Sequence, residues 1–216
     1  MNITLHHAPG ACSRTPLILL EQAGADYALR IVRLASGENH TEDFRRLNPR
    51  GKVPVLVHDG RVLSENVAIA GYLARLFPQA RLMPAAQDAW EQAQALSWLS
   101  WVASGVHPLI FRARMAGRVV EGEGAQASVK ARALEALGEQ LRTADKHLAE
   151  NEWLAASHWT APDAYLFWAT GRAADSGLSL SDLPHLRAHA ERMAAQPAVQ
   201  RAIAREKSAL ETGAPA

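Results

Sequence analysis

The sequence predicts an α/β domain followed by an all-helical domain. Runs of β-prone residues occur only in about the first 80 residues, and a stretch with two prolines and no clear period follows at 78–87. The remainder is rich in Ala and Leu at helical spacing. We therefore expect a small mixed sheet with helices on its faces, and then a helical bundle.

The start of the chain alternates strand and helix. Asn2–His7 is a short β-prone run that ends at a Pro-Gly turn, and the helical pattern after it stops at Gly24, a residue type that commonly ends helices. Tyr27–Leu34 alternates like a half-buried strand, and a short helix within 40–51 is broken by an Asn-Pro pair.

A hairpin and a helix complete the predicted N-terminal domain. Two apolar runs flank Asp59-Gly60, which is a strong hairpin signal, and residues 65–78 carry apolar positions close to one face of a helix. The predicted order is β-α-β-α-β-β-α. Helical stretches follow at about 88–117, 125–150, 162–177 and 183–208. We expect an N-terminal domain over residues 1–80, a linker over 81–86 and an all-helical domain over 87–216.

Composition excludes several classes of partner. Lys and Arg number 23 against 22 Asp and Glu, so the net charge of +1 provides no field that would gather nucleic acid or anionic lipid. The single cysteine excludes an internal disulfide and a cysteine metal cluster. The N-terminus lacks a signal-peptide pattern, and no apolar run approaches the roughly 18–20 residues that span a membrane. We expect a cytoplasmic protein without a metal, nucleic-acid or membrane partner.

Cys12, in "APGACSRTP", lies between the first predicted strand and helix. The free N–H groups and dipole at a helix N-terminus favour an anion, and thiol pKa values there fall below the ordinary value of about 8.5. Two interpretations remain: a reactive thiolate, and a small buried residue at a bend. Because no second cysteine exists, redox chemistry at this sulfur would need an outside thiol.

Two other features of the N-terminal domain have both a structural and a functional interpretation. Pro54, inside "KVPVL", predicts either an edge strand or a cis bond after Val53 that turns the backbone of Val53 toward a peptide-like ligand. Ser64, Glu65 and Asn66 precede a helix, so they form either an N-cap with a first-turn acid or a site for the α-amino-acid end of a ligand.

In the helical domain, Thr160 and Asp163 have the spacing of a capping box, which we assign to folding. His107 is followed by a proline and marks an expected bend in a long helix; most such histidines are structural. His6 and His7 point to opposite faces of a strand, so they make a poor metal pair.

Together these motifs resemble the cytosolic glutathione transferases, and most closely the bacterial beta class. The matching segments cover nearly the whole chain in the family's order: "APGACS", "NPRGKVPVL", "LSENVAIAGYLA", "WLSWVASGVHPLIF" and "TAPDAYLFWA". The resemblance implies a thioredoxin-like N-terminal domain with a mixed four-stranded sheet that binds glutathione. It also implies an all-helical domain with most of the site for an apolar second substrate, and a homodimer.

The resemblance assigns roles to individual residues. Cys12 matches the beta-class cysteine beside the glutathione sulfur, and Val53 matches the residue whose backbone pairs with the cysteinyl part of glutathione. Glu65 and Asn66 match the pair that holds the γ-glutamyl end. The catalytic candidates are Cys12, His107 and Ser13. The glutathione-binding candidates are Cys12, Lys52, Val53, Pro54, Ser64, Glu65, Asn66, Ser100, Ser104 and His107. The candidates for the apolar substrate site are Phe111, Met115, Tyr165 and Trp168, although aromatic residues at helical spacing are also typical of a core.

We expect an enzyme that conjugates glutathione to small hydrophobic electrophiles, as in detoxification, with glutathione-dependent disulfide or peroxide reduction through Cys12 as a second reaction. The alternatives are a non-catalytic glutathione- or ligand-binding protein, and a glutathione-dependent isomerase or dehalogenase. Two departures from the family pattern bear on activity. His7 stands where relatives often have tyrosine, and Gly37 lies near the position of a glutathione-binding lysine, so that contact is expected to be missing.

Overall fold

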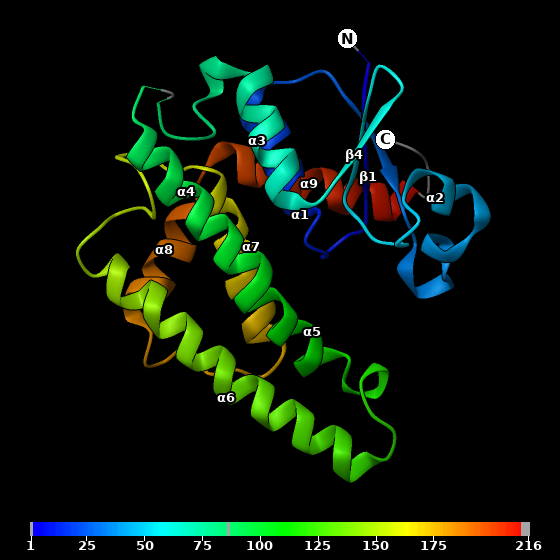
Figure 1. Ribbon diagram of the computed structural model, residues 1–216, viewed down its shortest axis with the longest axis vertical. Coiled ribbons are helices and arrows are strands. Elements are labelled where there is room, and N and C mark those ends of the chain that lie inside the picture. The colour runs from blue at the N-terminus through cyan, green and yellow to red at the C-terminus, as the bar shows by residue number, and fades with distance from the viewer. Residues whose placement is uncertain (1, 86, 213–216) are drawn as a thin grey trace. The chain divides into compact units, whose positions relative to one another are not determined.

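The computed structural model describes residues 2–85 and 87–212, which form two compact units (Figure 1). Unit 1 combines Met1–Met83 with Ala195–Ala216, and unit 2 is Pro84–Ala194. The predicted fold class is confirmed, and so is the order of the first seven main elements. These are β1 (Ile3–His7), α1 (Arg14–Ala23), β2 (Ala28–Ile31), α2 (Glu42–Leu47), β3 (Val55–His58), β4 (Arg61–Ser64) and α3 (Asn66–Leu76).

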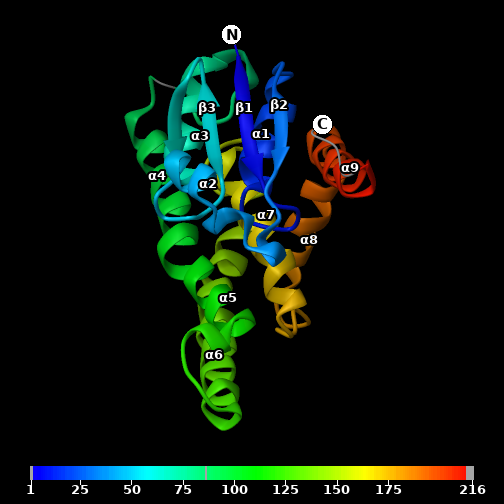
Figure 2. The same cartoon turned by 90° about the vertical axis from the view of Figure 1, so that its right-hand side faces the viewer.

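The sheet of unit 1 is four-stranded and mixed, with the order β2-β1-β3-β4. β1 runs parallel to β2 and antiparallel to β3, and the β3–β4 pair is the predicted hairpin. Asp59 and Gly60 turn this hairpin with φ values of 47° and 78°, as the Asp-Gly pair predicts. α1 and α3 cover one face of the sheet, while α2 lies beside the other face (Figure 2), where Phe44 contacts His6.

The stretch predicted as one helix over 183–208 is two helices, α8 (Pro184–Ala194) and α9 (Pro197–Thr212). Pro197 separates them because proline lacks the N–H that a continuous helix needs and its ring clashes with the preceding turn. α9 groups with unit 1, where it packs along α1 (Figure 1). α9 lies within the range 87–216 that we expect for the helical domain, whereas unit 2 ends at Ala194. The expected domain bounds stay a prediction, and residues 86 and 213–216 lie outside the described residues.

Unit 2 is helical, as expected. Its helices are α4 (Ala89–Trp101), α5 (His107–Arg114), α6 (Glu123–Leu148), α7 (Ala161–Asp175) and α8. α7 contacts α4, α5 and α8, and its first turn carries the predicted capping box of Thr160 and Asp163. Within residues 2–85 and 87–212, no helix combines the length and the apolar character needed to cross a membrane.

Candidate active site

Three segments that are far apart in the sequence meet at one end of the sheet in unit 1. His6 pairs with Val55, and Val55 pairs with Ser64. This register places three segments next to one another: the loop after β1, the segment before β3 and the start of α3. Cys12 comes from the first of these segments, Val53 from the second and Asn66 from the third.

Cys12 contacts both of the other segments. Its Sγ donates to the carbonyl oxygen of Val53 at 3.5 Å, and the Asn66 side chain hydrogen-bonds the same sulfur. All three residues are buried. The bond between Val53 and Pro54 is cis, which is one of the two alternatives that the sequence left open. The sequence-predicted neighbours of Cys12 are therefore brought together.

Of the two interpretations of Cys12, the structure favours the buried residue over the reactive thiolate. Burial raises the pKa of the Cys12 thiol to about 11, and the hydrogen bond from Asn66 offsets only part of this effect. Glu65 also raises the pKa, while Lys52 lowers it. Desolvation therefore raises this pKa by more than the N-terminus of α1 lowers it. Cys12 is a protonated hydrogen-bond donor at neutral pH.

Ser64 is not the cap of α3, contrary to one of its two interpretations. It ends β4, and its Oγ accepts a hydrogen bond from Arg50 at 2.9 Å. The N-cap is Glu65, whose side chain makes no capping bond and whose φ of 77° lies in the left-handed region. A non-glycine residue in this region is uncommon and is often found at functional sites.

Arg50 is a site residue that the sequence did not single out. Its guanidinium lies 3.0 Å from a carboxylate oxygen of Glu65, in addition to its bond to Ser64. The signal was the segment "NPRG", in which the proline and glycine set a loop and leave the arginine side chain at the surface. Asn66 is buried, and no described residue gives its Oδ1 a hydrogen bond. This unpaired oxygen is available to a ligand.

The loop before Val53 is held by two asparagines. Asn48 Nδ2 donates to Lys52 O at 2.7 Å, and Asn39 Nδ2 donates to Gly51 O at 2.8 Å. Gly51 has a φ of 61°, and a Cβ added there would lie 2.9 Å from the backbone oxygen of Asn39. Only glycine fits this position, because both the backbone conformation and the space exclude a side chain.

We expect Gly51→Ala to destabilise unit 1 by about 2–5 kcal/mol, because alanine adds both an unfavourable φ and a backbone clash. Gly37→Ala is the matched control. Gly37 has a similar φ of 77°, but no atom lies within 4 Å of an added Cβ. We expect that variant to lose only about 1–2 kcal/mol. Urea unfolding of both variants measures the difference, and equal losses would contradict the predicted clash with Asn39.

Ser13 serves the fold of the Cys12 loop. The Ala8 N–H donates to Ser13 Oγ at 3.1 Å, and the Ser13 hydroxyl lies 3.4 Å from Ala8 O. Ser13 is fully buried. Its hydroxyl therefore closes the turn that carries Cys12, and its predicted role as a catalytic donor stays a prediction.

In unit 2, His107 follows a π-helical turn, Val102–Val106, that joins α4 to α5. This turn lies at the expected bend, since Pro108 provides no N–H to the helix and wider turns accommodate such breaks. His107 Nδ1 lies 2.8 Å from the hydroxyl of Tyr165, and its ring packs against Trp168. Ser104, within the turn, donates to the carbonyl oxygen of Ser100 at 2.8 Å.

The four candidates for the apolar substrate site differ in exposure. Phe111 on α5 and Met115, which follows its last residue, are 42% and 37% exposed, whereas Tyr165 and Trp168 are buried. The two buried aromatic residues contact His107, and the two other side chains leave apolar surface exposed. Their predicted roles, like those of Ser100, Ser104 and His107 in glutathione binding, stay predictions. Among the described residues, no cluster of three or more His, Cys, Asp or Glu side chains could hold a metal ion.

Comparison with known proteins places this geometry in a family. Residues 10–76 match the model of the glutathione S-transferase N-terminal domain, and residues 106–197 match that of the C-terminal domain. The chain is 32% identical over 208 residues to glutathione S-transferase GstA of Escherichia coli O157:H7, covering 94% of this chain and 98% of that protein.

Solved structures agree over a similar length. The beta class glutathione S-transferase of Sphingomonas chungbukensis matches with a TM-score of 0.84 and 34% identity. A sphingomonad glutathione S-transferase complexed with glutathione matches with a TM-score of 0.83 and 34% identity. Each match covers 94% of this chain and 98% of the other. Because this similarity spans almost the whole chain and both domains, the protein belongs to the glutathione S-transferase family of enzymes.

Proposed function

We propose that the protein binds glutathione in unit 1 and transfers it to small apolar electrophiles. The observation that carries this proposal is the meeting of Cys12, Val53 and Asn66, with one buried Asn66 oxygen unpaired among the described residues. A thiol donor, a peptide carbonyl and an amide suit a ligand that is itself a cysteine-containing peptide. The sphingomonad relative, whose structure contains glutathione, supports the same assignment.

The proposed catalytic step is stabilisation of the glutathione thiolate. Cys12 is buried and protonated, so its S–H can donate to the glutathione sulfur once that sulfur has lost its proton to solvent. Hydrogen bonds to a thiolate lower its pKa and keep it ionised near neutral pH. The thiolate then attacks the electrophilic carbon of the second substrate. A carbon–sulfur bond forms as the bond from that carbon to its leaving group breaks, and the leaving group departs with the bonding electron pair.

The start of α3 suits the γ-glutamyl end of glutathione. The Glu65 carboxylate can pair with the α-ammonium group, and the first N–H groups of α3 can hold the α-carboxylate. Arg50 already pairs with Glu65, so it fixes the direction of that carboxylate. The amide of Asn66 adds an acceptor at the same place.

Reduction of disulfides or peroxides through Cys12 is the less favoured second reaction. An initial attack by Cys12 needs the thiolate, and the pKa of about 11 leaves only about one sulfur in ten thousand ionised at pH 7. Conjugation, in which Cys12 acts as a donor, does not require its ionisation. The protonated state of Cys12 therefore favours conjugation.

We also propose that the protein is a cytoplasmic homodimer that acts in detoxification. The exposed side chains of Trp90 and Leu96 on α4 support association, because they are apolar and are 73% and 43% exposed. Light scattering of the purified protein checks the dimer, and a monomer mass would exclude it.

We expect Asn66→Ala to weaken glutathione binding by about tenfold or more, because it removes a buried polar partner of the ligand. Titration calorimetry with glutathione measures this loss. Asn151→Ala is the matched control, since Asn151 is exposed and its Nδ2 donates to the nearby carbonyl of His147. Turnover of a panel of small apolar electrophiles at saturating glutathione then tests the reaction. If the wild type binds glutathione but converts no electrophile, a non-catalytic glutathione-binding protein is favoured. If the wild type does not bind glutathione, both the transferase and the non-catalytic glutathione-binding protein are excluded.

A further inference from the structure

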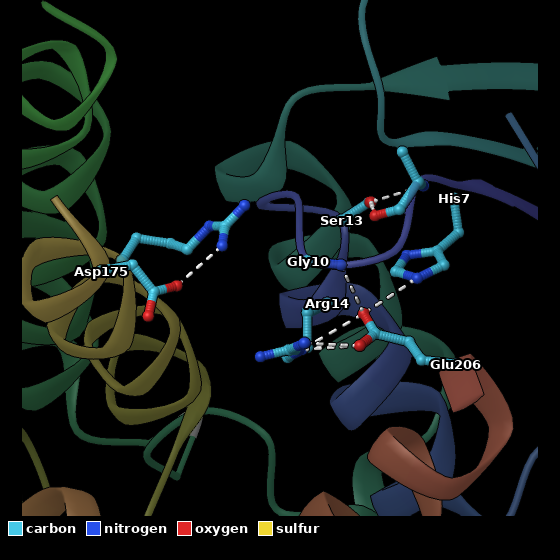
Figure 3. A network of polar contacts seen from close by, with 8 residues as sticks. His7, Gly10, Ser13, Arg14, Asp175 and Glu206 are labelled. Carbon is cyan, nitrogen blue, oxygen red and sulfur yellow. Dashed lines mark hydrogen bonds and ion pairs between the residues drawn. The ribbon is translucent and has the colours of Figure 1, made fainter. Parts of the chain in front are cut away.

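Glu206 on α9 contacts the loop that carries Cys12, although the two are almost at opposite ends of the chain. Glu206 Oε1 accepts the backbone N–H of Gly10 at 3.3 Å, across a separation of 196 residues. Arg14, the first residue of α1, directs Nε and one terminal nitrogen to the same carboxylate, at 3.1 and 2.5 Å from Oε2. Figure 3 shows these groups converging on Glu206.

His7 completes the surroundings of this carboxylate. Its Nε2 lies 3.0 Å from Glu206 Oε1. His7 and Glu206 are both buried, and Arg14 is partly buried. Burial alone would raise the pKa of the Glu206 carboxyl, but His7 and Arg14 outweigh it and lower this pKa to about 2. The carboxylate is therefore ionised at neutral pH.

The three partners of Glu206 bracket Cys12. His7 ends β1, Gly10 lies two residues before Cys12, and Arg14 lies two residues after it. Gly10 has a φ of 72°, so the loop turns sharply at the residue whose N–H reaches Glu206. Fixing the chain on both sides of a residue limits the positions that its side chain can take.

A second ion-pair cluster joins α9 to α1 without touching this loop. Glu21 of α1 is buried. Its Oε2 accepts from Arg201 Nε at 3.0 Å, and its Oε1 forms an ion pair with Arg205 Nε at 2.7 Å. Arg201 also donates to the backbone oxygen of Glu21 at 2.8 Å. This cluster provides an internal comparison, because it attaches the same helix at a site that lies beyond the Cys12 loop.

We propose that Glu206 is a positioning residue of the active site, which holds the Ala8–Ser13 loop so that the Cys12 thiol stays buried against Val53 and Asn66. The inference concerns the loop used by the proposed glutathione site, but its test does not depend on turnover. Local openings of a loop are governed by the contacts that hold it, and buried charged hydrogen bonds are among the strongest of these. Through Glu206, α9 helps to hold the Cys12 loop of unit 1 in place.

The test uses the alkylation rate of Cys12, because the chain has no other cysteine. Iodoacetamide is applied to the full chain at fixed pH in native buffer. We expect Glu206→Gln to raise the rate at least about tenfold, since it replaces a charged acceptor with a neutral one and leaves Arg14 without its counter-ion. Glu206→Asp keeps the charge, so its alkylation rate should lie between those of the wild type and Glu206→Gln. If Glu206→Gln does not fold, the rate of Glu206→Asp is compared with that of the wild type instead.

Arg201→Gln is the matched control, since it weakens the second α9 attachment and leaves the Glu206 contacts in place. We expect its alkylation rate to stay within about twofold of the wild type, because the loop contacts are unchanged. Cys12 can become exposed by opening of the loop or by global unfolding, and low urea concentrations separate these two causes. An alkylation rate set by loop opening depends little on urea, whereas one set by global unfolding depends steeply on it. Equal rates in Glu206→Gln and the wild type, equal acceleration in Arg201→Gln, or a steep urea dependence would each overturn the proposal.

Discussion

Asp163→Ala is expected to lower the free energy of unfolding by about 3–5 kcal/mol, because it removes one partner from a fully buried charged network. Asp163 Oδ2 accepts from the backbone N–H of Thr160 at 2.8 Å and from its hydroxyl at 3.1 Å. Asp163 Oδ1 accepts from Leu154 N at 2.9 Å and lies 3.0 Å from His189 Nε2. The residue therefore joins the start of α7 to the preceding loop and to α8.

Asp175→Ala provides the comparison on the same helix. Asp175 pairs with Arg172 at 2.8 Å, but its side chain is 55% exposed, and such surface pairs contribute no more than about 1 kcal/mol. Urea unfolding of both variants in one buffer measures the difference. A loss below about 1 kcal/mol in Asp163→Ala would show that the buried network does not stabilise the fold.

The ionisation of Cys12 gives the second large effect. In the protein without glutathione, we expect the thiolate absorbance of Cys12 to reach half its maximum near pH 11, because burial raises the pKa to about 11. The absorbance of an ordinary exposed thiol would reach half its maximum at a pH of about 8.5. Ultraviolet titration measures the thiolate, and the same titration of Cys12→Ala subtracts the ionisation of the tyrosines. A midpoint below 8 would contradict the protonated donor role.

The sheet and its helices could be predicted because local signals agreed with the fold. The Asp59-Gly60 pair between two apolar runs predicted the hairpin, and Gly24 ended α1 as expected, with a φ of 60°. The capping box at Thr160 was also readable, since its residue types and spacing are specific. Each of these signals depends on a few neighbouring residues, which is the information that a sequence carries directly.

Effects of tertiary contacts could not be predicted in the same way. The pattern over 183–208 is helical throughout, and no local pattern reveals that α9 packs along α1 and forms ion pairs with it. The position of Cys12 at a helix N-terminus favoured a lowered pKa in one of its two interpretations, but burial raises this pKa even though the hydrogen bond from Asn66 lowers it. Desolvation is set by the whole surroundings of a group and not by its neighbours in the chain.

The candidate site was predicted in part. The sequence placed Cys12, Val53 and Asn66 in one site through a family resemblance, and the register of β1, β3 and β4 gives the physical reason for their meeting. Arg50 and Glu206 were not identified, because one is a surface arginine in a loop and the other is a glutamate in a helix rich in charges. In neither case do the neighbouring residues in the sequence indicate which distant residue the side chain contacts.

The most direct test of the proposed function is the ultraviolet thiolate titration repeated with saturating glutathione, for the wild type and Cys12→Ala. We predict a new thiolate signal with a midpoint below the ordinary value of about 8.5, which belongs to bound glutathione and persists in Cys12→Ala. In that variant its midpoint should rise by about one pH unit, because the bound thiolate loses the hydrogen bond from Cys12. A midpoint at or above about 8.5 for bound glutathione in the wild type would contradict the proposed function, and the same midpoint in both proteins would contradict the role of Cys12.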